Sequence, residues 1–180
     1  MTLHITQFEG SNALSSFRVQ QLLPALQGVH EKIAGISARF VHLVAGDSAP
    51  DAALSAQLAA LLTYGDPYTG PTDGPLIVVS PRLGTVSPWA SKATDIAHNC
   101  GLAVHRIERL VEYRLTLKNG LLSKTALTAE QLERVAALLH DRMTESAMLE
   151  RAQALGLFSA LQAAPMDHVD VLGGGKVALE

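Results

Sequence analysis

The residues best suited to anion chemistry lie in one run, residues 81–101, with the sequence PRLGTVSPWASKATDIAHNCG. Arg82 follows a short apolar segment, and its planar guanidinium suits bidentate binding of a phosphate or a carboxylate. Ser87 followed by Pro88 is typical of a helix start, where free backbone N–H groups and the helix dipole favour an anion. The sequence therefore predicts an anion site built from a strand end, a flexible loop and a capped helix.

Four further residues complete this candidate site. Gly84 and Thr85 lie in the loop, where Gly84 gives conformational freedom, and Lys92, one turn into the helix, can reach over the helix start. Trp89 lies on the apolar face of the helix and is expected in the core, with its indole N–H on a backbone acceptor. The alternatives are a surface ion pair for Arg82, and for Lys92 a pair with the acid three residues on.

The predicted helix also carries a serine, an aspartate and a histidine on one polar stripe, namely Ser91, Asp95 and His98. A catalytic triad needs the histidine between the serine and the carboxylate, and three residues on one straight helix do not converge in that way. Local hydrogen bonds or an interface are the simpler interpretation. Cys100, near the helix end, is expected to be a small buried hydrophobic residue.

The elements that position these residues indicate an α+β fold. Residues 76–79, LIVV, are β-branched and too few for a helix, so they predict the strand that delivers Arg82. Thr128 and Gln131 form a capping box that predicts another helix start. The other helices are predicted at 14–27 and at 50–62, capped by Asp47 or Ser48, and the other strands at 3–8, 33–44, 104–117 and 169–172.

A weak internal repeat indicates that the fold is built twice. The apolar spacing over residues 29–43 recurs over 104–117 with one residue inserted in the first copy, and a helix precedes and follows each copy. We therefore predict two tandem βαββα units, ferredoxin-like and related by pseudo-twofold symmetry, rather than a doubly wound parallel sheet. Phe17 on the first helix and Met143 on the last are expected on buried faces.

Composition excludes several classes of protein. The 180 residues carry 14 basic and 17 acidic side chains, a net charge of −3 without charge blocks, so neither nucleic acid nor a membrane surface is an expected partner. No apolar run approaches the roughly 20 residues of a membrane span. The single cysteine allows no intrachain disulfide, the start lacks a signal-peptide pattern, and no histidine pair has zinc-ligand spacing. We expect a cytoplasmic protein without a metal site.

The run 81–101 closely resembles the N-terminal part of the large single-chain phosphoribosylformylglycinamidine synthases of purine biosynthesis. Their matching segment is Pro-Arg-x-Gly-Thr-x-Ser-Pro-Trp-x-Ser-Lys-Ala-Thr-Asp-Ile-Ala-x-Asn-Cys-Gly. The resemblance continues at residues 10–18 (GSNALSSFR), 139–145 (LHDRMTE) and 169–173 (VDVLG). It spans the chain and is loosest over residues 44–74, 118–127 and 150–166.

This resemblance implies the domain organisation. The multi-protein versions of the enzyme use a small accessory subunit that dimerises, and the N-terminal domain of the single-chain type resembles that dimer fused into one chain. The implied divisions are an accessory-subunit-like domain at 1–148 with halves at about 1–65 and 75–148, a linker at 149–167, and the truncated start of the next domain at 168–180. The segment between the halves is rich in glycine and proline, as expected of a boundary.

The resemblance also implies a function. The parent protein is an ATP- and glutamine-dependent ligase that converts formylglycinamide ribonucleotide to its amidine. The glutaminase cysteine, which is not Cys100, and the ATP and magnesium ligands belong to other domains, so this chain is expected to hold no cofactor and to be inactive alone. Its implied partners are the synthase and glutaminase domains of the same chain and the ribonucleotide substrate. Its implied substrate-proximal or interface residues are Arg82, Gly84, Thr85, Ser87, Trp89 and Lys92.

Two other classes of function remain open from the sequence. The domain implied by the resemblance is non-catalytic and helps to shape the substrate site and the ammonia route of the parent. The alternatives are a free-standing module that binds a small molecule or a protein, and a small enzyme that uses the stripe of Ser91, Asp95 and His98. A native mass and a ligand screen would discriminate them.

Overall fold

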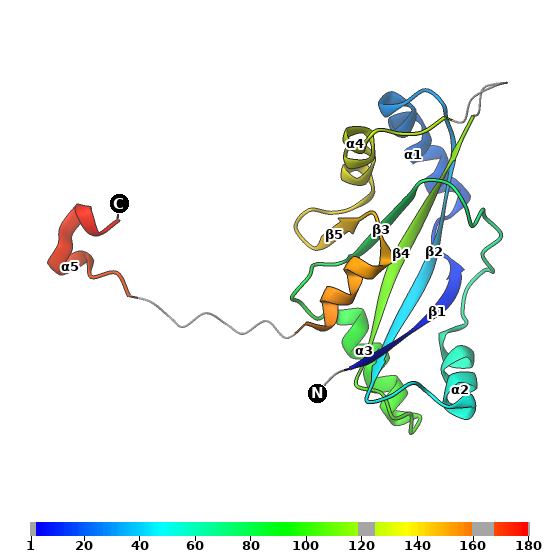
Figure 1. Ribbon diagram of the computed structural model, residues 1–180, viewed down its shortest axis with the longest axis horizontal. Helices are drawn as coiled ribbons and strands as arrows, with labels where there is room; N and C mark the ends of the chain where they lie inside the picture. The colour runs from blue at the N-terminus through cyan, green and yellow to red at the C-terminus, as the bar shows by residue number, and fades with distance from the viewer. Residues whose placement is uncertain (1–2, 119–124, 160–167, 180) are drawn as a thin grey trace.

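The computed structural model describes residues 3–118, 125–159 and 168–179 and has an α+β architecture around a five-stranded sheet (Figure 1). The order of strands across the sheet is β1-β2-β4-β3-β5, and each neighbouring pair is antiparallel. The prediction of antiparallel pairing is therefore confirmed. The strands are β1 (His4–Asn12), β2 (Ile33–Gly46), β3 (Leu76–Pro81), β4 (Arg106–Leu117) and β5 (Glu145–Met148).

The helices begin where side chains cap free backbone N–H groups. Ser87 caps α3 by accepting from the Ala90 N–H at 3.0 Å, and Thr128 with Gln131 forms the predicted capping box of α4. Asp51 caps α2, accepting from the Leu54 N–H at 2.8 Å, so the expectation of Asp47 or Ser48 was wrong. The helices are α1 (Ser16–Val29), α2 (Ala52–Leu62), α3 (Pro88–Asn99), α4 (Ala129–Leu139), α5 (Val171–Gly174), and the 3₁₀ helices η1 (Arg151–Phe158) and η2 (Gly175–Leu179).

One face of the sheet is covered by two pairs of helices. Figure 1 shows α1 and α4 toward one end of the long central strands and α2 and α3 toward the other. Because side chains alternate between the two faces along a strand, Ile36 and Val44 of β2 lie on the same face. Ile36 and Leu115 pack under the first pair of helices, whereas Val44 and Ile107 pack under the second. Each fully buried aliphatic side chain of this kind contributes about 1.5 to 3 kcal/mol. The centre of the sheet lies between the two clusters.

The opposite face of the sheet is covered by η1. Leu157 of η1 is buried against Leu110 and Val41 of the central strands. Beside this apolar contact lies a network of charged groups, in which Glu112 of β4 accepts hydrogen bonds from Arg39 of β2 and Arg151 of η1. The 3₁₀ helix is thus held on the sheet by both burial and ion pairs.

The structure corrects the predicted order of elements. The first half, at 1–65, has the order βαβα instead of the predicted βαββα, because β2 is one continuous 14-residue strand that absorbs its irregularity at Ile33–Gly35 without ending. The second half, at 75–148, has the order βαβα followed by the short strand β5. Residues 169–172 were predicted as a strand, but Asp170 caps the Gly173 N–H at 2.8 Å and starts α5. The arrangement remains consistent with a ferredoxin-like fold.

Two predictions of buried side chains were also wrong. Phe17, in the first turn of α1, is 66% exposed, and Met143 is 77% exposed because α4 ends at Leu139. Among residues 3–118, 125–159 and 168–179, no helix has the length and apolar character needed to cross a membrane.

Candidate functional site

The β3–α3 loop, residues 82–87, has a fixed backbone. The Arg82 N–H donates to the Thr144 carbonyl at 2.9 Å, and the Thr85 hydroxyl donates to the Arg82 carbonyl at 2.6 Å. Gly84 has a φ of +81°, in the left-handed region that favours glycine. Gly84 and Thr85 therefore shape the loop.

Arg106 of β4 anchors this loop from the other side of the sheet. Its guanidinium donates to the Thr85 carbonyl at 2.9 Å and to the Leu157 carbonyl of η1 at 3.0 Å, and it forms an ion pair with Glu108. Burial raises the pKa of Glu108, and the hydrogen bond and the charge of Arg106 oppose that rise. Arg106 thus ties the β3–α3 loop to η1, a role that the sequence did not predict.

The predicted site residues separate into two groups. The side chain of Arg82 is exposed, and within the described part of the chain it has no ion-pair partner. Two cavities lie beside α3, and Arg82, Gly84 and Thr85 line neither of them. Each of Ser87, Trp89 and Lys92 lines at least one of these cavities.

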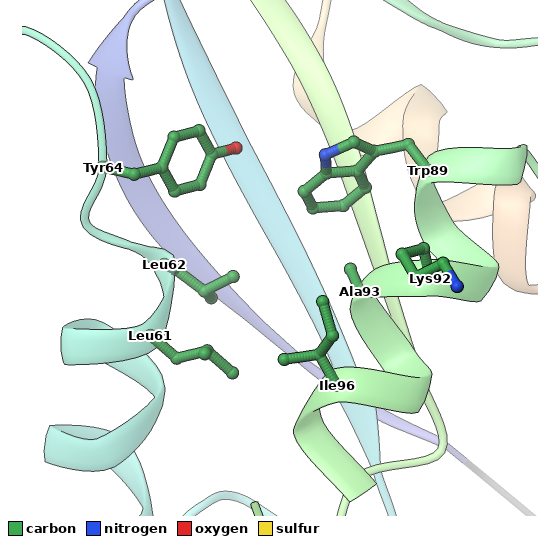
Figure 2. Close-up of a pocket in the computed structure, with 7 residues that line it drawn as sticks. All are labelled: Leu61, Leu62, Tyr64, Trp89, Lys92, Ala93 and Ile96. Atoms are coloured by element: carbon green, nitrogen blue, oxygen red, sulfur yellow. The ribbon is translucent and has the colours of Figure 1, made fainter. Parts of the chain in front are cut away.

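Trp89 lies between two cavities. The first, which we call the apolar cavity, has a volume of about 310 Å³ and lies between α2 and α3 (Figure 2). Its lining comprises Leu61, Leu62, Tyr64, Trp89, Lys92, Ala93 and Ile96. The second, which we call the polar cavity, has a volume of about 270 Å³ and is lined by Ser80, Ser87, Thr144, Arg109 and Trp89 among others. Trp89 is half-buried and packs against the apolar cluster under α2 and α3, so the expectation of a core position is confirmed in part.

Lys92 does not pair with Asp95 among the described residues, although that pair was one alternative. Figure 2 shows its ammonium end pointing away from Tyr64, so its aliphatic stem is the part that borders the apolar cavity. Lys92 and Arg82 are therefore two cations without an ion-pair partner among the described residues.

Arg109 of β4 is held between aromatic rings at the centre of the sheet. Its guanidinium carbon lies 4.3 Å from the ring centroid of Phe40 and 4.5 Å from that of Trp89. Its Nη1 donates to the Tyr64 hydroxyl at 3.3 Å, and His42 Nε2 lies 2.8 Å from the same oxygen. Cation–π contacts and this hydrogen bond fix the plane of the guanidinium.

His42 is fully buried beside this cluster. Burial and the positive charge of Arg109 lower the pKa of His42 from 6.5 to about 4, so the ring is neutral near pH 7. The sequence analysis missed both residues. A signal did exist, since strand alternation places His42 on the face of Val44, and Arg109 on the face of Ile107, where apolar residues are expected.

The stripe on α3 does not form a triad in the described structure. His98 Nε2 lies 2.7 Å from the Val104 carbonyl, and the Ser91 hydroxyl lies 3.4 Å from the Ser87 carbonyl. Cys100 is exposed, contrary to the prediction, because it is the C-cap residue at the end of α3. Among the described residues, no group of three or more histidine, cysteine or acidic side chains is placed to hold a metal ion.

The chain matches a model of a known protein family. Residues 39–158 fit the family model described as formylglycinamide ribonucleotide amidotransferase N-terminal. The matched range contains the β3–α3 loop, Arg106 and every residue that lines the apolar and polar cavities.

Proposed function

The chain belongs to the family of formylglycinamide ribonucleotide amidotransferase N-terminal domains, and we propose that it is a non-catalytic domain of the parent ligase. That family forms the N-terminal domain of phosphoribosylformylglycinamidine synthase in purine biosynthesis. The family match over residues 39–158 carries the proposal. In the parent, glutamine is hydrolysed in one domain and the ammonia is used in another to convert the amide of the ribonucleotide to an amidine.

The β3–α3 loop is the part of the domain that we propose meets the substrate or a neighbouring domain. Arg106 and the Thr144 carbonyl hold its backbone, whereas the side chain of Arg82 is exposed and lacks a carboxylate partner among the described residues. Because the backbone of the loop is already held, binding of an oxyanion needs to order only the side chain of Arg82. The nearby start of α3 adds a positive dipole end capped by Ser87.

We further propose that the two halves of the domain arose from one duplicated unit. The first four elements of each half follow the order βαβα, and within each half the first two strands pair antiparallel. The first helix of each half begins with a serine cap, Ser15 for α1 and Ser87 for α3. The long antiparallel pairing of β2 with β4 supports the proposal, because a pseudo-twofold axis would then lie between these two strands.

The remaining expectations concern the parent protein. We propose that the synthase and glutaminase domains of the same chain are the partners of this domain, and that the parent acts in the cytoplasm. We propose that ATP and magnesium bind in the synthase part of the parent, as the family resemblance implies. The domain would then shape the substrate site and the ammonia route.

Replacing Arg82 by alanine in the full-length ligase tests the proposed role of the loop. One charge-assisted contact contributes roughly 1.5 to 3 kcal/mol, so kcat/KM for the ribonucleotide should fall about ten- to a hundredfold. The glutaminase half-reaction and the Tm of the domain should stay near wild type. The matched control is Arg134→Ala, since Arg134 is exposed on α4 and lines neither cavity. If Arg82→Ala unfolds the domain while each folded molecule keeps full activity, Arg82 is structural and the proposal is wrong.

The 180-residue chain alone is expected to show no glutaminase, ATPase or amidine-forming activity. The reason is that the resemblance places the nucleophile and the metal ligands in other domains of the parent. Glutamate release from glutamine and phosphate release from ATP would be measured with the purified chain. A turnover that survives repurification would contradict a non-catalytic role.

A further inference from the structure

Arg109 differs from the other arginines of the central strands in lacking an acidic partner. On the face of the sheet that η1 covers, Arg39, Arg106 and Arg114 each form an ion pair with a glutamate of β4. Arg109 is half-buried, and among the described residues no carboxylate lies within ion-pair distance of it. The described polar contact of this guanidinium is one hydroxyl, and its other close contacts are aromatic rings. Its positive charge is therefore not neutralised by a neighbouring carboxylate and attracts anions.

The surroundings of Arg109 leave one side open. Phe40 and Trp89 contact the guanidinium at 4.3 and 4.5 Å from their ring centroids, and Nη1 is bonded to the Tyr64 hydroxyl. A guanidinium has five N–H donors in one plane, and one of them is used here. The other four donors have no partner among the described residues, and Arg109 lines the polar cavity.

The polar cavity has one further feature that suits an anion, because it borders the positive end of α3. Ser87 caps this end by accepting from the Ala90 N–H, and its hydroxyl is in hydrogen-bonding contact with the Glu108 carboxylate. Glu145 also lines the cavity, but its Oε2 accepts from the Asp141 N–H at 2.8 Å and it forms no ion pair with Arg109. The cavity, at about 270 Å³, has room for a small acid.

We infer that the polar cavity beside Trp89 binds a small oxyanion, a carboxylate or a phosphate group, on the open edge of Arg109. The planar guanidinium provides parallel N–H donors to two oxygens of the anion. Such an anion could belong to a free metabolite or to an acidic side chain of a neighbouring domain. This inference does not rest on the proposed role of Arg82, because Arg82 does not line the cavity.

The protein carries its own reporter of this site. Trp89 is the only tryptophan of the chain, and its ring lies against Arg109, so tryptophan fluorescence reports on the surroundings of this guanidinium. The purified 180-residue chain would be titrated with inorganic phosphate and with N-acetylaspartate amide, at constant ionic strength set by chloride. We expect a saturable fluorescence change with at least one probe. Tighter binding of phosphate would identify a phosphoryl ligand, and tighter binding of the amide would identify an acidic side chain.

Variants of Arg109 decide the assignment. Arg109→Gln should weaken the binding of the probe at least tenfold, whereas Arg134→Gln, which removes the same charge from the exposed face of α4, should bind like wild type. If Arg109→Gln does not fold, Arg109→Lys keeps the charge but loses the planar fork, and about fivefold weaker binding by calorimetry is then expected. No saturable change in the wild-type chain, or equal affinity in the folded Arg109 variant, would overturn the inference.

Discussion

Replacing Glu112 by glutamine is expected to lower the free energy of unfolding by about 3 to 5 kcal/mol, the cost typical of breaking a buried ion pair. Glu112 is fully buried on β4 and accepts hydrogen bonds from Arg39, Arg114 and Arg151. Burial alone would raise its pKa, but the hydrogen bond and charge of Arg151, with the charges of Arg39 and Arg114, hold the pKa of Glu112 below its ordinary value. The carboxylate is therefore charged, and its loss leaves three guanidinium groups undercompensated.

Urea unfolding at about pH 7, followed by the fluorescence of Trp89, measures this loss. The matched control is Glu133→Gln, because Glu133 is exposed on α4 and its replacement should change stability by no more than about 0.5 kcal/mol. Since Arg151 lies on η1, the Glu112 variant should also expose η1 to limited proteolysis. Equal stability of the two variants would contradict the role of this network in holding η1 on the sheet.

Local chemistry explains which elements the sequence predicted correctly. The predicted strand at 76–79 lies within β3, and the Ser87–Pro88 pair starts α3 as expected. The capping box of Thr128 and Gln131 forms as predicted. In each case the determining atoms are a few residues apart, so the sequence itself holds the information.

Tertiary contacts explain the errors. Phe17 and Met143 lie at the periodic positions of predicted helices, but α4 stops at Leu139 and the first turn of α1 projects beyond the sheet. The short strand β5 has no alternating pattern of its own and forms because Ala147 and Met148 meet β3. The strand propensity of the four residues of β5 does not predict this pairing, because the pairing depends on contacts with β3.

The candidate site divides in the same way. Ser87 and Trp89 were predicted from one continuous run, and both line the polar cavity. Arg109 was missed because its significance comes from Phe40, Tyr64 and Trp89, which three separate segments bring to it. A polar residue on an inward position of a strand is a usable signal, but its partners appear only in the fold.

Lowering the pH from about 7 to 4 is expected to destabilise the protein by about 3 kcal/mol through His42 alone. Burial, and then the charge of Arg109, lower the pKa of this ring from 6.5 to about 4. Between these values the unfolded chain binds a proton at His42 that the folded chain does not, so the free energy of unfolding falls as the pH falls. Above 6.5 the ring is neutral in both states, so His42 adds no pH dependence there.

His42→Gln isolates this effect, because a glutamine amide can either donate to the Tyr64 hydroxyl or accept from it but does not titrate. The variant can be less stable than wild type at pH 7, so the informative quantity is the change in unfolding free energy between about pH 7 and pH 4. One pKa unit corresponds to about 1.4 kcal/mol, and the wild type should therefore lose about 3 kcal/mol more than the variant. The exposed His4 provides the control, since His4→Gln should keep the wild-type slope. Equal slopes for wild type and His42→Gln would mean that the ring takes up a proton in the folded state, which the neighbouring charge of Arg109 and its burial both oppose.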